Sequence, residues 1–150
     1  MDRPIAEAIA TTPRRGITGK EVMVLLGKKY GPVEWESRYD PVSELVYTIL
    51  SQHTSDINSE RAFNQLMENF GSFEEVAEAD TELIAECINV GGLARIKAPR
   101  IKQVLNLILE KLGSFDLYFL KEMPMDEAKA WLKDLPGIGP KTAAVILCFA

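Results

Sequence analysis

The eight residues Leu135-Pro136-Gly137-Ile138-Gly139-Pro140-Lys141-Thr142 decide the fold of this chain. Gly137 and Gly139 permit backbone dihedrals that larger residues resist, and Pro140 suits the first position of a helix, where no amide hydrogen is needed. The apolar residues that follow predict a helix that begins at Gly139 or Pro140. The preceding segment, Met125 to Asp134, is also typical of a helix because its apolar residues fall on one stripe. The stretch therefore predicts two helices joined by a tight glycine hairpin.

A helix that starts in this way can bind an anion, because its first amide groups have no acceptor within the helix. Lys141 lies beside these amides, although a cation there faces the positive end of the helix dipole at a cost of roughly 0.3–1 kcal/mol. The same field, with partial burial in a cleft, favours the neutral amine that a nucleophile requires. From the hairpin alone, a solvated lysine that pairs with a phosphate is an equally good interpretation.

The rest of the chain predicts helices and no strand, because alternation of apolar and polar residues never persists. Helix starts are indicated by Thr18 with Glu21, Asp40-Pro41, Thr54 or Ser55, Ser72 with Glu75, and Asp80, whose helix is expected to run through Val90. Gly71, Gly91-Gly92 and Gly113 are expected to end helices. We expect an all-α, multi-helix globular domain over residues 40–150, with the helix-hairpin-helix motif at 125–150. Residues 1–39 are expected to form a leader, with a short helix and the helix after Thr18, that packs on this main body.

The charge of the chain limits how it could hold a polyanion. Seventeen basic and twenty-two acidic residues give a net charge of −5, which argues against binding by bulk electrostatics. The best local patch lies at the start of the helix that runs to about Leu112, where eight residues without an acid contain Arg95, Lys97, Arg100 and Lys102. We expect these cations to project from the exposed side of that helix and its leading loop. An ordinary solvated helix face explains each cation, taken singly, at least as well.

Length and cysteine content place the chain among single-domain globular proteins. It has 150 residues, and no apolar run is long enough to span a membrane. The only cysteines, Cys87 and Cys148, lie far apart on apolar helical patterns. We interpret both as reduced, buried thiols of a cytosolic protein.

From about Asp40 to Ala150 the sequence resembles the helix-hairpin-helix DNA glycosylases, and Leu-Pro-Gly-Ile-Gly-Pro-Lys-Thr-Ala most resembles their endonuclease III branch. The resemblance implies an enzyme of base excision repair, a DNA N-glycosylase with apurinic/apyrimidinic (AP) lyase activity. In the family, the lysine at the position of Lys141 attacks the sugar C1′ of a damaged nucleoside, forms a Schiff base and cleaves the strand by β-elimination. The hairpin residues Gly137, Ile138, Gly139, Lys141 and Thr142 are then expected to contact DNA.

The same resemblance implies the partner and the setting of the protein. The expected partner is double-stranded DNA with damaged bases or abasic sites, with oxidised pyrimidines as the first expectation and mismatched or alkylated bases as alternatives. We expect a monomer that is cytoplasmic, associated with the nucleoid, and without a membrane partner.

Two further positions match residues that distort DNA in the family. His53, after Leu50, occupies the place of a glutamine that fills the hole left by the flipped nucleotide, and Gln52 next to it is expected to share this role. Leu93, after Gly91-Gly92, matches an apolar wedge that unstacks bases, with Arg95 and Lys97 placed to meet the flanking phosphates. The alternatives from the residues themselves are a half-buried histidine at a helix end and a loop leucine within the core.

The sequence departs from the family at its end. It stops within the apolar segment Ala143 to Ala150 without a stop signal, so we expect a truncated domain. No acid follows Lys141 to match the catalytic aspartate of the family. Four cysteines hold a 4Fe-4S cluster in many members, whereas two isolated cysteines cannot, so we expect no metal or cofactor in this chain and leave a cluster to the full-length protein. The predicted activity belongs to the complete protein; whether these 150 residues act alone stays open.

The competing hypothesis is a helix-hairpin-helix module that binds DNA without chemistry. Such a module would lose affinity mildly on replacement of Lys141, whereas a lyase would lose strand cleavage and keep much of its binding. A helical interaction domain with no nucleic-acid role fits the acidic charge but leaves the glycine hairpin unexplained.

Overall fold

The computed structural model of the chain describes residues 16–150, which fall into two compact units that divide between Glu36 and Ser37. The described part of the first unit holds one helix, α1 (Gly19–Tyr30). The side chain of Thr18 accepts from the Glu21 amide and that of Glu21 accepts from the Thr18 amide, which confirms the capping box. The packing of the leader on the main body stays a prediction, and the short helix expected before residue 16 lies outside the described residues.

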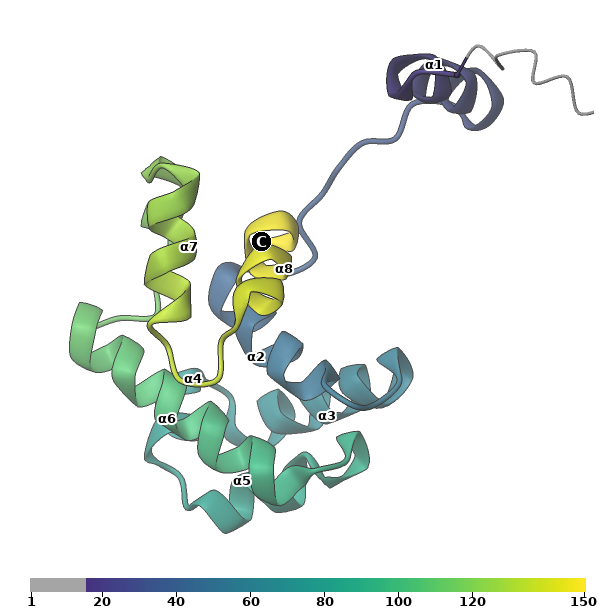
Figure 1. Cartoon of the computed structure of the whole chain (residues 1–150). Helices are drawn as coiled ribbons and strands as arrows, with labels where there is room; N and C mark the ends of the chain where they lie inside the picture. Colours follow the sequence, from purple (N-terminus) through teal and green to yellow (C-terminus); the bar gives the residue numbers. More distant parts are fainter. Residues whose placement is uncertain (1–15) are drawn as a thin grey trace, which may run out of the picture. The chain divides into compact units, whose positions relative to one another are not determined.

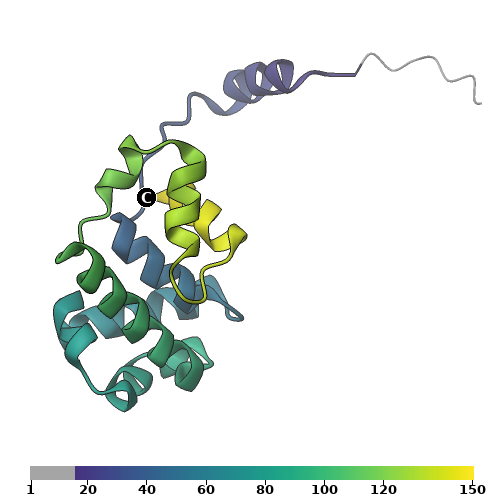
Figure 2. The same cartoon turned by 60° about the vertical axis from the view of Figure 1, so that its left-hand side comes forward.

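The second unit is built from helices alone, and the described residues contain no strand, so the predicted all-α class is confirmed. Its elements follow one another along the chain with short connections, as Figures 1 and 2 show. They are α2 (Pro41–Ser51), α3 (Asp56–Phe70), α4 (Phe73–Glu78), α5 (Thr81–Cys87), the 3-10 turn η1 (Asn89–Gly91), α6 (Ala94–Leu112), the 3-10 turn η2 (Tyr118–Glu122), α7 (Met125–Lys133) and α8 (Pro140–Phe149).

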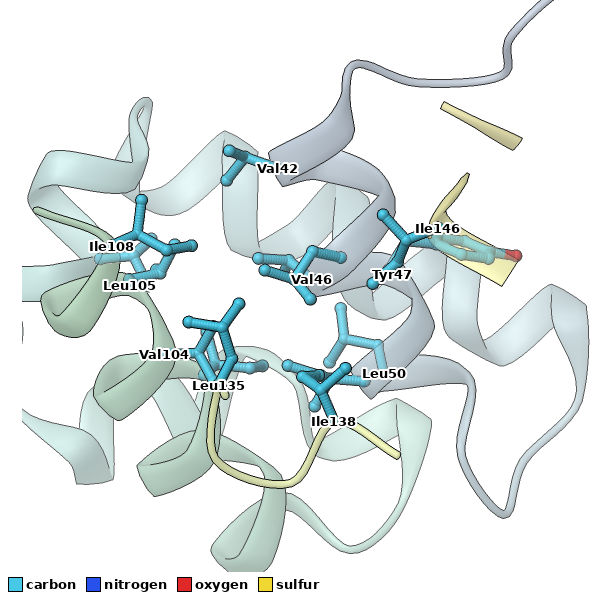
Figure 3. Close-up of a cluster of buried hydrophobic side chains, with 14 of the residues drawn as sticks. Val42, Val46, Tyr47, Leu50, Val104, Leu105, Ile108, Leu135, Ile138 and Ile146 are labelled. Atoms are coloured by element: carbon cyan, nitrogen blue, oxygen red, sulfur yellow. The ribbon is translucent and has the colours of Figure 1, made fainter. Parts of the chain in front are cut away.

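Helix α2 forms the centre of the second unit. Its residues from Pro41 to Leu50 are all buried, and it packs against α3, α6 and α8. It begins where the sequence predicts, because the Asp40 carboxylate accepts from the amides of Val42 and Ser43 and Pro41 needs no acceptor. Figure 3 shows its apolar side chains, Val46 and Leu50 among them, within one cluster of buried residues. A helix buried on every side fixes the position of whatever follows its last turn.

Two details of the fold differ from the sequence prediction. Helix α5 ends at Cys87 instead of Val90, and the side chain of Asp80 makes no capping hydrogen bond. The tighter turn η1 follows, and it brings Gly91 against α3, where an added Cβ would meet the Cβ of Ala62 at 3.1 Å.

The two cysteines also differ from the prediction. Cys148 is exposed and Cys87 half-buried, so the prediction of two buried thiols is wrong. Cys148 lies on the opposite side of α8 from Ile146, which is the residue that faces the core.

None of the helices in residues 16–150 combines the length and the apolar character that a membrane-spanning helix needs.

Candidate active site and nucleic-acid interface

The chain between α7 and α8 bends sharply instead of continuing as one helix, as Figures 1 and 2 show. Two apolar side chains anchor the bend, because Leu135 is 1% and Ile138 is 5% exposed. They point from the bend into the cluster that contains Val104 of α6 and Leu50 of α2 (Figure 3). The Ile138 amide donates to the Leu135 carbonyl at 3.2 Å and closes the turn. The predicted hairpin is therefore present.

Ile138 has a different role from the one expected. Its side chain is buried and its amide is already donated within the turn, so neither group can contact DNA. The prediction of Ile138 as a DNA-binding residue is wrong, because the apolar side chain between the two glycines secures the bend to the core instead.

The two glycines of the hairpin also differ in what they do. Gly137 has φ +78, and a Cβ placed there would lie 2.6 Å from Nε and 2.7 Å from Cδ of Arg100, whose side chain crosses the bend. Gly139 has φ −92 and ψ 178, which any residue adopts, and open space where its Cβ would be. The sequence argument from dihedral freedom holds for Gly137 and is wrong for Gly139. What Gly139 provides is an uncovered backbone directly before α8.

Alanine substitutions at the two glycines should have opposite effects on folding and on binding. Gly137→Ala should lower the free energy of unfolding by about 1–2 kcal/mol or more, because of its left-handed backbone and the contact with Arg100. Gly139→Ala should leave the free energy of unfolding unchanged within about 0.5 kcal/mol, yet weaken binding to duplex DNA, because a methyl group covers the approach to the α8 amides. Urea denaturation and fluorescence anisotropy measure the two quantities. Equal destabilisation by both substitutions would contradict the assignment.

Helix α8 begins without a cap. Gly139 has no side chain, and no other side chain accepts a hydrogen bond from the amides of the first turn. The amides of Lys141 and Thr142 thus have no acceptor within the helix and face outward. Because the helix dipole adds positive potential at this end, an anion such as a phosphate oxygen is the natural acceptor.

Lys141 lies beside a pocket of about 450 Å³ that also contains the residues predicted to distort DNA. The pocket joins the end of α2 and the loop after it to the first turns of α8, and its lining is Thr48, Ser51, Gln52, His53, Lys141, Thr142 and Val145. The structure thus brings together the predicted site residues Gln52, His53, Lys141 and Thr142, although nearly ninety residues of sequence separate the two groups. An exposed primary amine at the rim of such a pocket can reach a ligand inside it.

Sequence reasoning missed three residues of the pocket wall: Thr48, Ser51 and Val145. The signal that could have found them is helical spacing. Thr48 and Ser51 fall on one face of α2, Gln52 directly follows its last residue, and Val145 follows Lys141 by one helical turn on α8. Polar residues at this spacing in an otherwise apolar helix indicate a face that meets a cavity.

A buried carboxylate lies behind the pocket wall. Glu44 is fully buried, and its side chain accepts from Thr48 Oγ1 at 3.4 Å. The guanidinium of Arg38 pairs with it at both oxygens, Nη2 to Oε1 at 2.5 Å and Nε to Oε2 at 3.2 Å. Arg38 also lies over the ring of Tyr47, with 4.1 Å between Cζ and the ring centroid. Burial raises the pKa of Tyr47, and the charge of Arg38 acts in the opposite direction. These contacts fix the turn of α2 that carries Thr48.

His53 and Leu93 share a backbone conformation that sets them apart. They are the only non-glycine residues with positive φ in residues 16–150, at 55° and 51°. Both are exposed, with Leu93 at 48%, so the alternatives of a half-buried histidine and a core leucine do not hold. A non-glycine residue in this region costs about 1–2 kcal/mol, which the fold tolerates where side-chain placement matters. In both cases the strained backbone turns a side chain outward at the end of a helix or turn.

The predicted cationic patch is only partly present. Arg95 is exposed. Arg100 is half-exposed, and its side chain lies next to Gly137. Lys102 is half-buried and donates to the carbonyl of Ala79. Lys97 is 2% exposed and donates to two backbone carbonyls, so the prediction of Lys97 as a phosphate contact is wrong. The helical spacing of Lys97 with Ala98 and Ile101 places it on the buried face of α6. Burial lowers the pKa of the Lys97 amine.

The residues present do not fit a four-thiolate iron–sulfur cluster. The sequence has two cysteines, on α5 and α8, and the described residues contain no group of three or more His, Cys, Asp or Glu side chains that could hold a metal ion. No step of the chemistry below depends on a cluster.

Comparison with known proteins gives one family. The model of the HhH-GPD superfamily base excision DNA repair proteins matches residues 46–142. The chain is 37% identical over 108 residues to endonuclease III of Thermotoga maritima, covering 72% of this chain and 46% of that protein. It is 35% identical over 109 residues to endonuclease III of Sulfolobus acidocaldarius, covering 70% and 46%. The chain thus spans about half the length of these curated relatives.

Solved structures agree with the sequence comparison. The 3-methyladenine DNA glycosylase of H. pylori superposes with a TM-score of 0.66 at 26% identity, over 87% of this chain and 62% of that one. Endonuclease III in a non-covalent complex with DNA has the same fold, with a TM-score of 0.65 at 24% identity, over 90% and 61%. The family match contains both left-handed residues, the hairpin and Lys141. The chain therefore belongs to the HhH-GPD superfamily of base excision DNA repair proteins.

Proposed function

We propose that the protein is a DNA N-glycosylase with AP lyase activity, of the endonuclease III type, that acts on duplex DNA containing damaged bases or abasic sites. The observation that carries the proposal is the pocket whose lining contains Lys141 together with Gln52 and His53, next to the uncapped first turn of α8. A helix-hairpin-helix that only gripped DNA could use the amides and could pair Lys141 with a phosphate, but it would not need a pocket beside the amine.

Each part of the site has a role in this reaction. The amides of Lys141 and Thr142 donate hydrogen bonds to a phosphate of the strand, which positions the sugar above the pocket. The Nζ of Lys141 attacks C1′, the base leaves with the electrons of the glycosidic bond and takes up a proton, and a Schiff base forms after ring opening. Loss of a C2′ proton then expels the 3′ phosphate and nicks the strand. His53 and Leu93 occupy the space that the displaced nucleotide leaves in the duplex.

The covalent intermediate gives the direct test. Full-length protein mixed with an abasic-site duplex and sodium borohydride should form a stable covalent complex, because borohydride reduces the Schiff base. Mass spectrometry of the digested complex should place the adduct on Lys141. If the duplex were nicked without formation of a covalent adduct, the assignment of a Schiff-base lyase would be wrong.

The substrate class rests on the resemblance to the endonuclease III branch. Oxidised pyrimidines remain our first proposal, with mismatched and alkylated bases as alternatives, because histidine replaces the glutamine of the endonuclease III segment at position 53. Release of free base from duplexes that each carry one lesion would decide among these classes. We further propose that the protein acts as a monomer.

Leu93 provides a separate test of DNA distortion. Leu93→Ala should weaken binding to an abasic-site duplex by about tenfold while thermal stability stays nearly unchanged, because the side chain is half-exposed and contributes little to the core. Anisotropy titration and thermal melting measure the two effects. A parallel loss of affinity and stability would show that Leu93 supports the fold instead.

A further inference from the structure

One buried lysine contacts the backbone before each of the two left-handed residues. Lys97 lies in the first turns of α6 and is 2% exposed. Its Nζ donates to the Leu50 carbonyl at 2.7 Å and to the Gly91 carbonyl at 2.9 Å. Its own amide donates to the Leu93 carbonyl at 2.9 Å. The carbonyls of Leu50 and Gly91, which lie about forty residues apart in sequence, therefore meet at one side chain.

Each of the two carbonyls that Lys97 Nζ contacts lies shortly before one of the left-handed residues. Leu50 is in the last turn of α2, shortly before His53, and Gly91 is the last residue of η1, shortly before Leu93. The junction is tightly packed, because an added Cβ on Gly91 would meet the Cβ of Ala62 at 3.1 Å and the Leu50 carbonyl at 4.0 Å. A change at Lys97 would therefore act on the starting points of both loops together.

Packing alone does not explain a lysine at this position. Its amine is held by carbonyls, and no carboxylate pairs with it in the part of the chain that the structure describes. Burying an ammonium group is costly even with good acceptors, and methionine would fill similar space without that cost. The C-terminal end of α2 offsets part of the cost, since its dipole favours a cation. What the amine adds beyond packing is a fixed connection between the two loops.

We propose that Lys97 is a positioning residue that sets the spacing of His53 and Leu93, so that both side chains enter a damaged duplex together. The proposal rests on the function proposed above. Its physical basis is preorganisation: loops already held in the bound arrangement lose less conformational entropy on binding. Lys97 therefore favours the distorted, lesion-containing duplex, and it contributes little to contacts with the phosphates of intact DNA.

The test measures selectivity, which is the ratio of affinities for a duplex with a tetrahydrofuran abasic-site analogue and for the intact duplex. In the full-length protein, Lys97→Met should lower this ratio by about tenfold while affinity for intact DNA stays within about twofold. The matched control is Lys102→Met, which removes another lysine–carbonyl bond of α6, to Ala79, at a distance in sequence from both loops. Lys102→Met should leave the ratio unchanged.

A double-variant comparison separates positioning from general stability. In a His53→Gly/Leu93→Ala background, Lys97→Met should have almost no further effect on selectivity, because the side chains that it positions are absent. An undiminished loss in that background, or full selectivity in the single variant, overturns the proposal. If Lys97→Met does not fold, Lys97→Gln is tested in the same comparison. If neither variant folds, Lys97 is required for folding, and the proposal is overturned as well. A wild-type protein with no preference for the abasic analogue would instead contradict the proposed function.

Discussion

Replacing Lys141 by alanine should abolish borohydride trapping and reduce strand cleavage at abasic sites by on the order of 10³-fold or more, because the nucleophile itself is removed. Affinity for the abasic duplex should change by less than about tenfold, since the amides that donate to the phosphate belong to the backbone and remain. Single-turnover cleavage of a labelled duplex and anisotropy titration of the same duplex measure the two effects in the full-length protein.

Lys133→Ala is the matched control for this prediction. Lys133 is an exposed lysine at the end of α7, before the hairpin, and it does not line the pocket. Its loss should leave cleavage within about twofold of wild type. If Lys141→Ala lowered affinity mildly and wild-type protein neither cleaved nor trapped the duplex, the chain would be a DNA-binding module without chemistry.

The largest effect on stability is expected at Arg38. Arg38→Met should lower the free energy of unfolding by about 3 kcal/mol, because it leaves the carboxylate of Glu44 buried without its cation. We place the effect at the lower end for buried pairs because the side chain of Arg38 is 44% exposed, so that water screens part of the interaction. Urea denaturation at neutral pH, followed by circular dichroism, gives the value.

The double variant Arg38→Met/Glu44→Gln tests the cause of that loss. Removing the charge together with its partner should recover a large part of the stability, since an uncharged amide is less costly to bury than an unpaired carboxylate. A double variant that is less stable than Arg38→Met would show that the loss comes from the ring contacts of Arg38 and not from the stranded charge.

Local signals in the sequence were sufficient for the helical class of the second unit and for several of its helix starts. The side chains of Asp40, Ser55 and Ser72 each accept a hydrogen bond from a backbone amide at the start of a helix, as expected. The hairpin lies where two glycines and a proline predicted it. Such features depend on residues a few positions apart, which makes them readable from one sequence. The end of α5 was not readable in this way, because the close contact of Gly91 with α3 is a tertiary feature.

The site was predictable in part, and the limit is again tertiary. Lys141, His53 and Leu93 could be named from motifs, but Thr48 and Val145 enter the site only because α2 and α8 pack side by side. Lys97 shows the reverse error. A lysine in a basic run is normally solvated, and only the positions of two carbonyl groups from other segments make its burial favourable.

The reduced cationic patch at the start of α6 has a kinetic consequence. With Lys97 inside the core and Lys102 held by a loop carbonyl, the predicted patch keeps only Arg95 and Arg100 to meet the phosphates of intact duplex, on a chain that is acidic overall. Residence on any undamaged stretch should therefore be brief, and the search for a target should proceed by many short collisions instead of long one-dimensional sliding.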